Sequence, residues 1–316
     1  MELRQLRYFV AITESGSFSR AAERVYVAQS AVSHQMAQLE SELGTSLFHR
    51  SRRGIVLTEA GQRFFPHAVS ILRQSEEAVA SARNATDALC GKVVFGLPHS
   101  ASNALALPLL REVRRQFPLI QLELTEELTG NLSRQLITGQ INLAVLFDDG
   151  GLSEFDFVPL LRERMYLIAP AQGADDQTAT ISLKQALSLP LILPASPHGV
   201  RPIIEAAALR AGLAPPRVSA DISSISILRT SLLAGLGQTL LPLMPLQQEI
   251  EAGLLRARAV VDPPLERMLA ICASRHIPVS SASQAVARLT RNLVRQLCAS
   301  QDWLGATHVP GGPDPD

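Results

Sequence analysis

The chain has 316 residues, more than one compact domain usually holds, so we expect two or three structural units. Its 29 Lys and Arg residues balance 29 Asp and Glu residues, which excludes a global positive field that would draw the whole protein onto nucleic acid. Three cysteines are too few for a disulfide framework, and no uninterrupted apolar stretch follows the first residues, so we expect a cytoplasmic protein without a membrane span.

The first predicted helix carries an apolar stripe. Residues on this stripe recur at the three- and four-residue steps of one helix face: Leu3, Leu6, Phe9, Val10 and Thr13. Gly16 ends this helix, and Ser19 is a suitable N-cap for a second one. In that second helix, Ala21 and Ala22 are small enough to let a neighbouring helix approach closely.

A third helix is expected to begin near Gln29 or Ser30. Val32, Met36, Leu39 and Leu43 share one face of it, which leaves a polar, nearly uncharged arc on the other side. The candidate DNA-reading residues on or beside this arc are Gln29, Ser30, Ser33, His34 and Gln35. Gln can form two hydrogen bonds to adenine in the major groove, and Ser can bond a base edge or a phosphate. The alternative is an ordinary solvated helix face.

A basic cluster follows the third helix and favours the DNA-binding interpretation. Arg50, Arg52 and Arg53 lie at a Gly-containing turn between two short apolar runs, 47–48 and 55–57. This pattern predicts a β-hairpin wing that carries phosphate-binding charge. Because the chain as a whole is neutral, attraction to DNA must come from this local cluster.

Residues that carry a family resemblance are dense in the first 61 positions. They are Leu6, Phe9, Gly16, Ser17, Phe18, Ala21, Ala22, the run 29–35, Leu39, Glu40, Leu43, Gly44, Leu47, Phe48, Arg50 and the run 58–61. On these residues the segment resembles the winged helix-turn-helix of the LysR-type transcriptional regulators, and the following domain is most similar to the nitrogen-assimilation and cyanate-type branches. The resemblance implies binding to promoter or operator DNA, homodimers or homotetramers, a small-molecule effector and action on RNA polymerase.

Residues 59–90 are expected to form a long linker helix. Thr58 can cap it, and residues such as Phe65, Leu72 and Val79 follow a heptad-like seam. About thirty residues make a helix of roughly 45 Å, longer than a head of residues 1–58 can cover. One alternative is that the helix packs only on its own domain. A partner helix is the better explanation, and the resemblance likewise implies paired linker helices, so these three residues are candidate dimer contacts.

Beyond residue 90 the pattern alternates between strands and helices. Predicted strands are 93–97, 122–124, 143–147, 165–169, 191–193, 239–241 and 269–273. Predicted helices are 102–116, 131–138, 201–211 and 224–234. The alternation predicts an α/β fold with crossover helices.

The resemblance sharpens this fold to an effector domain over 91–298, made of two Rossmann-like subdomains like those of periplasmic binding proteins. The chain is expected to cross between them near Leu161 and to return within 263–267. Subdomain I would then contain 92–161 and 267–298, and subdomain II would contain 162–266. The tail, 299–316, is expected to be flexible because Gly, Pro and Asp dominate its end.

Candidate effector-binding residues lie where predicted strands end, since ligands of such sheets bind beyond the carboxyl ends of the strands. They are Ser100, Ser102, Thr129, Phe147, Ser196 and His198. Ser102, Thr129 and Ser196 are also good helix N-caps, with or without a ligand. The expected ligand is a small molecule, most consistent with an anion.

Motifs for catalysis, metals and cofactors do not emerge from the sequence. It has no nucleophile elbow, phosphate-cradling Gly-rich loop or His-Glu-Xaa-Xaa-His helix, so we expect neither enzyme activity nor a cofactor. His99 and His198 could face each other, but no third ligand has recognisable spacing, so no metal site is expected.

Two alternatives stay open. One is a thiol-redox regulator of the same fold, using Cys90, Cys272 or Cys298. The other is a solute-binding module whose N-terminal helices serve only as an interaction surface.

Overall fold

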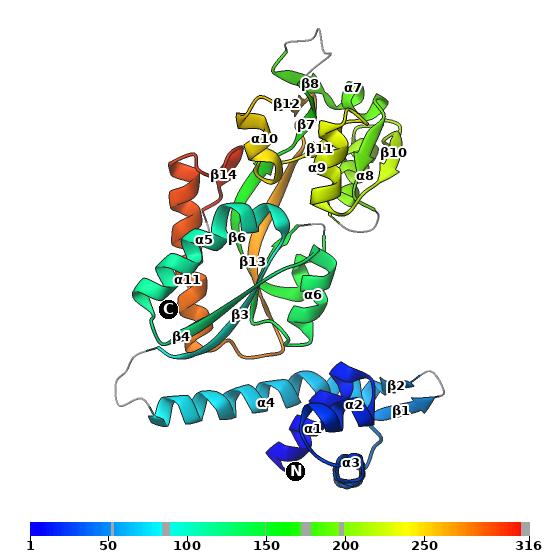
Figure 1. The fold of residues 1–316 in the computed structure, drawn as a ribbon, viewed down its shortest axis with the longest axis vertical. Coiled ribbons are helices and arrows are strands. Elements are labelled where there is room, and N and C mark those ends of the chain that lie inside the picture. The colour runs from blue at the N-terminus through cyan, green and yellow to red at the C-terminus, as the bar shows by residue number, and fades with distance from the viewer. Residues whose placement is uncertain (52–53, 84–88, 149, 172–177, 196–198, 311–316) are drawn as a thin grey trace.

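The computed structural model describes residues 1–51, 54–83, 89–148, 150–171, 178–195 and 199–310. An N-terminal head is followed by a long helix and by a larger α/β body with two subdomains (Figure 1). Within these ranges no helix is long and apolar enough to cross a bilayer.

The head contains three helices and a hairpin around one apolar core. Its elements are α1 (Leu3–Ser15), α2 (Phe18–Arg24), α3 (Gln29–Leu43), β1 (Phe48–Ser51) and β2 (Gly54–Leu57). Phe9 is fully buried, and its ring centroid lies 5.3 Å from that of Phe48 and 5.1 Å from that of Phe64. The hairpin and the following helix therefore share the core of the three helices.

The start of α2 differs from the prediction. Its N-cap is Ser17, whose hydroxyl accepts a hydrogen bond from the backbone N–H of Arg20. Ser19 lies inside the helix, so its assignment as the cap was wrong. Ser17 has the extended backbone that a cap requires, with φ −157° and ψ 133°.

The long helix α4 (Glu59–Arg83) begins just after strand β2 of the wing. The hydroxyl of Thr58 accepts a hydrogen bond from the N–H of Gly61 at 3.0 Å, so Thr58 caps the helix as predicted. A Cβ at Gly61 would lie 2.2 Å from the carbonyl oxygen of Leu47. Only glycine allows α4 to approach Leu47, the residue before β1, this closely.

Further along, α4 contacts the body as well as the head. Arg73 donates a hydrogen bond to the carbonyl oxygen of Pro278. Val69 lies against Gly139, where an added Cβ would be 2.7 Å from a Val69 methyl. Figure 1 shows α4 lying along the first subdomain, with the head at its beginning.

The first subdomain is built on a six-stranded sheet in the order β14-β6-β13-β5-β3-β4. Its elements are β3 (Gly91–Leu97), α5 (His99–Gln116), β4 (Ile120–Glu126), α6 (Thr129–Ile137), β5 (Leu143–Phe147), a 3-10 turn η1 (Leu152–Glu154), β6 (Phe155–Arg164), β13 (Glu266–Ser274), α11 (Ser281–Ala299) and β14 (Ala306–His308). β3 runs parallel to β4 and β5, whereas β13 runs antiparallel to β5 and β6. One face packs on α5 and α11 and the other on α6, because alternate strand residues point to opposite faces.

The second subdomain has a four-stranded sheet, β11-β7-β12-β8, and a parallel pair, β10-β9. Its elements are β7 (Tyr166–Pro170), β8 (Thr180–Ser182), α7 (Leu183–Ser188), β9 (Leu191–Leu193), α8 (Arg201–Arg210), β10 (Val218–Asp221), α9 (Ile225–Leu233), β11 (Thr239–Leu241), a 3-10 turn η2 (Met244–Leu246), α10 (Gln247–Glu251) and β12 (Leu255–Val261). It has its own apolar core, separate from that of the first subdomain.

The two strands that join the subdomains are β6 and β13. They stay paired up to Arg164 and Glu266, and the chain passes into the second subdomain at Met165. The predicted crossing near Leu161 is therefore too early in the chain. The return, beside Leu265, falls within the predicted range 263–267.

The segment after α11 is ordered, contrary to the flexible tail expected for 299–316. Trp303 is only 1% exposed and belongs to the core of the first subdomain, and β14 pairs with β6. The Gly- and Pro-rich composition that suggested a flexible tail belongs to 311–316, which lie outside the described residues.

Candidate nucleic-acid interface and ligand cleft

The helix α3 presents a polar face because its apolar residues are buried in the core of the head. Val32, Met36 and Leu39 are fully buried. Leu43, expected on the same face, is instead 37% exposed at the end of the helix. On the opposite arc Gln29, Ser30 and His34 are exposed, and Ser33 and Gln35 are half-buried.

Two of these side chains are hydrogen-bonded to each other. The Nε2 of Gln29 donates a hydrogen bond to the Oγ of Ser33 at 2.8 Å, one helical turn away. The Oε1 of Gln35 is buried without a hydrogen-bond partner in the part of the chain that the structure describes. Gln29 and Ser33 thus form one polar unit at the start of α3.

Tyr26 was not among the predicted contacts, yet it lies in the turn just before α3. Its side chain is 95% exposed, and its backbone adopts the left-handed conformation, φ 56°, in the turn between α2 and α3. Sequence reasoning treated this turn only as a connection. An aromatic residue in the short turn that leads into a polar helix was the signal that could have identified it.

The wing is fixed to α3 by a carboxylate. The Oε1 of Glu40 accepts hydrogen bonds from the backbone N–H groups of Leu47 and Phe48, at 2.7 and 3.3 Å. Arg50 lies in β1, paired with Ile55 of β2. Arg52 and Arg53, the other predicted phosphate contacts, lie outside the described residues.

The three predicted dimer contacts on α4 have different environments. Phe65 is 3% exposed and packs in the head core with Phe9, so its assignment as a dimer contact was wrong. Its side chain packs within its own chain because the first turns of α4 cover the head. Leu72 is half-buried beside the same core, and Val79 is 47% exposed.

A cleft with a volume of about 500 Å³ lies between the two subdomains. It is lined by segments at or after strand ends, which are 98–100, 126–129, 194, 199–200, 223–226, 241–242 and 245, together with Phe147 and Arg267. Of the predicted effector contacts, it brings together Ser100, Thr129 and Phe147. Ser196 and His198 lie outside the described residues.

Beneath the cleft lies a buried polar network that sequence reasoning missed. Arg267 of β13 donates to the carboxylate of Glu163 of β6 at 2.6–2.7 Å and to the Oγ of Ser100 at 2.6 Å. Trp303 Nε1 donates to the other oxygen of Glu163 at 2.8 Å. The guanidinium carbon of Arg267 lies 3.8 Å from the ring centroid of Phe147.

This network joins the ligand cleft to both connecting strands and to the C-terminal segment. Glu163 is 0% exposed and Arg267 is 5% exposed. Burial lowers the pKa of Arg267, and the adjacent carboxylate of Glu163 opposes that effect. The partners lie far apart in the chain, so no local pattern could have predicted their contact.

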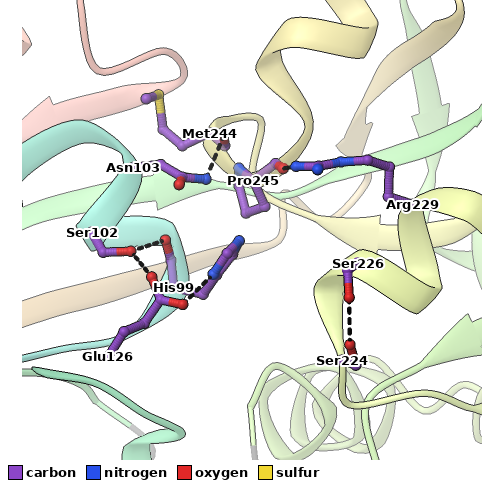
Figure 2. A network of polar contacts seen from close by, with 9 residues as sticks. All are labelled: His99, Ser102, Asn103, Glu126, Ser224, Ser226, Arg229, Met244 and Pro245. Carbon is purple, nitrogen blue, oxygen red and sulfur yellow. Dashed lines mark hydrogen bonds and ion pairs between the residues drawn. The ribbon is translucent and has the colours of Figure 1, made fainter.

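A second polar group lies at the mouth of the cleft. The carboxylate of Glu126 accepts hydrogen bonds from His99 Nδ1, at 2.8 Å, and from the hydroxyl of Ser102. Burial raises the pKa of Glu126, but the hydrogen bonds from Ser102 and His99 outweigh it, so the pKa is lower than usual. Figure 2 shows this group with Ser224 and Ser226 on the facing subdomain.

Two expected N-caps do not act as caps. Ser102 lies within the first turn of α5 and bonds the carbonyl oxygen of His99 as well as Glu126. The N-cap of α6 is Leu128, so Thr129 is the first helical residue. The hydroxyl of Thr129 therefore has no capping role.

A second cavity, of about 590 Å³, lies between α11 and the sheet of the first subdomain. It is slightly larger than the cleft, and its lining is mostly apolar but includes Arg275, Arg288 and Arg291. The cleft remains the better ligand site because buried polar groups from both connecting strands converge on it. In the described residues, no three His, Cys, Asp or Glu side chains gather closely enough to hold a metal ion.

Family models match most of the chain. Residues 3–62 match the bacterial regulatory helix-turn-helix of the lysR family, and residues 86–295 match the LysR substrate-binding domain. The nitrogen assimilation regulatory protein nac of Klebsiella aerogenes is 33% identical over 296 residues, which cover 93% of this chain and 95% of that protein.

Solved structures share the fold. A full-length OxyR variant from Pseudomonas aeruginosa superposes with a TM-score of 0.72 at 24% identity, covering 93% of this chain and 95% of the other. Full-length CbnR complexed with its target DNA gives a TM-score of 0.55 at 22% identity, covering 93% and 100%.

Proposed function

The chain belongs to the LysR family of bacterial DNA-binding transcriptional regulators, and on that premise we propose that a small molecule in the cleft controls how it binds promoter DNA. We further propose that it acts in the cytoplasm as a homodimer or homotetramer and that it contacts RNA polymerase. The family assignment leaves no basis for reading the head as a mere interaction surface.

The observation that carries the proposal for DNA reading is the division of α3 into two faces. One face is buried in the head, whereas Gln29, Ser30 and His34 are exposed on the other. An uncharged polar helix face of this kind suits the major groove, where Gln and Ser can bond base edges. Arg50, Arg52 and Arg53 of the wing would neutralise phosphates beside it.

A physical route from the cleft to the head supports the proposal for control. Arg267 and Glu163 lie on the two connecting strands, so a ligand that changes their surroundings acts where the subdomains pivot. The first subdomain in turn contacts α4 through Pro278 and Gly139. A change in the angle between subdomains can therefore alter the position of α4 and of the head it carries.

Of the three predicted dimer contacts on α4, Val79 is the exposed one and stays a candidate for pairing between chains. We expect Val79→Arg to weaken the dimer, since it would put a charge into the helix pair. Size-exclusion chromatography with light scattering would measure the change. An unchanged mass would remove this surface from the dimer.

The DNA-binding proposal is tested by footprinting on the DNA upstream of the protein's own gene. Ser33→Ala is expected to relax base preference, whereas Arg52→Ala should weaken all sequences alike and lower the salt slope by about one. Ser41→Ala, an exposed serine at the far end of α3, is the matched control. Retention of full site preference by Ser33→Ala would exclude that residue from base reading.

A further inference from the structure

We propose that the ligand of the cleft is a zwitterion, a free amino acid or a compound with the same pair of amino and carboxylate groups. This rests on the proposed function, since it concerns the same cleft and narrows the chemistry of its occupant. The sequence suggested an anion, and the proposal keeps that carboxylate while adding an ammonium group.

Thr129 gives the first reason to expect a ligand here. Its side chain is 8% exposed, and its Oγ1 is buried without a hydrogen-bond partner in the described residues, although it lines the cleft. A buried hydroxyl left unsatisfied costs free energy, so such a group usually has a partner. Because Thr129 does not cap α6, a cleft ligand is the partner its position offers.

His99 leaves a second unsatisfied atom at the cleft. A carboxylate can only accept, so Nδ1 of His99 carries the proton that is shared with Glu126. In the neutral imidazole this makes Nε2 an acceptor, and Nε2 is buried without a partner among the residues that the structure describes. It is therefore suited to a ligand N–H group, such as an ammonium.

The charges along the cleft also favour an ammonium group. Glu126 and Glu127 both line the cleft, and Glu126 is held ionised by its hydrogen bonds. Among the described lining residues, Arg267 is the single Arg or Lys, and Glu163 already pairs with it. A purely anionic ligand would meet two carboxylates against one neutralised cation.

Donors for a carboxylate are present at two helix starts in the cleft. The residues before α5 and α6 are Pro98 and Leu128, neither of which has a side chain that can cap the helix. The first backbone N–H groups of both helices are left for an anion. The hydroxyl of Ser100 accepts from Arg267, which leaves its own proton free to donate, and Thr129 supplies another hydroxyl.

The test measures the melting temperature of the full-length protein with each proteinogenic L-amino acid at millimolar concentration. For each amino acid that raises it, the matched half-molecules are measured too, for example isocaproate and isoamylamine for leucine. We expect at least one amino acid to stabilise the protein and both of its half-molecules to fail. No response to any amino acid, or an equal response to the carboxylate alone, would overturn the inference.

Titration calorimetry of variants locates the site. Glu126→Gln and Thr129→Val should each weaken binding of the stabilising amino acid about tenfold, since each removes one polar partner. Two matched controls should bind normally. Thr138→Val removes a hydroxyl that bonds the carbonyl of Arg134 at the other end of α6, and Glu123→Gln neutralises a glutamate that pairs with Lys92 outside the cleft. Unchanged affinity in both cleft variants would contradict the site.

The same preparations separate this inference from the proposed function. Sequence-specific DNA binding without any amino-acid response would end the zwitterion inference and leave the regulator intact. If the wild-type protein showed no sequence-specific DNA binding, the proposed function would be contradicted instead.

Discussion

The start of α3 and the ligand cleft are both polar surfaces, but they are built in opposite ways. The α3 surface comes from one short segment, and its Gln29, Ser30 and His34 are exposed. The cleft is concave and comes from segments on both subdomains, and its central charges, Glu163 and Arg267, are buried and paired. A substitution on α3 should therefore change one contact. A substitution beneath the cleft should instead disturb the whole hydrogen-bonded network.

This difference also separates specificity from stability. Exposed groups on α3 have water as a partner when DNA is absent, so their loss should cost little folding free energy. Groups beneath the cleft have no such replacement, because removal of one leaves others buried and unpaired. The following predictions probe this contrast, from the largest expected effect to the smallest.

Glu163→Ala should produce the largest loss. It leaves Arg267 and the Nε1 of Trp303 buried without their partner, and we expect the free energy of unfolding of the body to fall by about 3–5 kcal/mol. Trp303 is the single tryptophan of the chain, so its fluorescence reports unfolding of the body and not of the head. Chemical denaturation followed by this signal is the measurement.

The control for that experiment is Glu266→Ala, which removes an exposed carboxylate from the strand that carries Arg267. It should change the unfolding free energy by less than about 0.5 kcal/mol. Equal losses in both variants would show that the buried network has no special contribution.

Gly61→Ala tests the packing between head and linker. The new Cβ would lie 2.2 Å from the carbonyl oxygen of Leu47 and 2.9 Å from a methyl of Leu57, so we expect a cost of about 1–3 kcal/mol. DNA binding should weaken while the unfolding signal of Trp303 stays unchanged. Gln62→Ala, at an exposed neighbouring position, should retain DNA binding, and equal weakening there would refute the packing explanation.

A double-mutant cycle of Gln29→Ala and Ser33→Ala tests whether these side chains read DNA as a unit. Because they are hydrogen-bonded at 2.8 Å, their effects on operator affinity should fall short of additive by about 1 kcal/mol. Fluorescence anisotropy at fixed salt would measure all four proteins. Strict additivity would mean that the hydrogen bond breaks when DNA binds.

The smallest effect is expected at two thiols, the buried Cys272 and the half-buried Cys298, which bear on the thiol-redox alternative. Burial raises the pKa of Cys272 to about 12 and that of Cys298 to about 11, so thiolate, the reactive form, is scarce at neutral pH. Iodoacetamide labelling of the native protein should therefore spare both residues. Rapid labelling of either, with a peroxide-dependent change in DNA binding, would revive that alternative.

Local features of the head could be predicted from the sequence because its elements follow one another closely. Leu6 and Phe9 of the predicted stripe on α1 are buried and Thr58 caps α4, whereas Leu3 of the same stripe is 41% exposed. Ser17 and Ser19 could not be told apart, since both suit an N-cap and the choice depends on backbone conformation.

The cleft was only partly accessible to the same reasoning. Strand ends suggested Ser100, Thr129 and Phe147, and all three line the cleft, because strand ends gather at one edge of a sheet. Glu163 and Trp303 carried no comparable signal, since their contact joins a strand to a segment whose composition suggested disorder. The prediction for Phe65 was wrong because its heptad spacing fits a dimer seam and the head core equally well.

The central claim, that occupancy of the cleft governs DNA binding by the head, is tested most directly by one comparison. The affinity and footprint of the full-length protein on the DNA upstream of its own gene are measured with and without the stabilising amino acid, for the wild type and for Thr129→Val. We expect the ligand to change DNA binding by the wild type and to leave the variant unchanged at the same concentration. Identical responses of the two proteins, or no response from either, would contradict the claim.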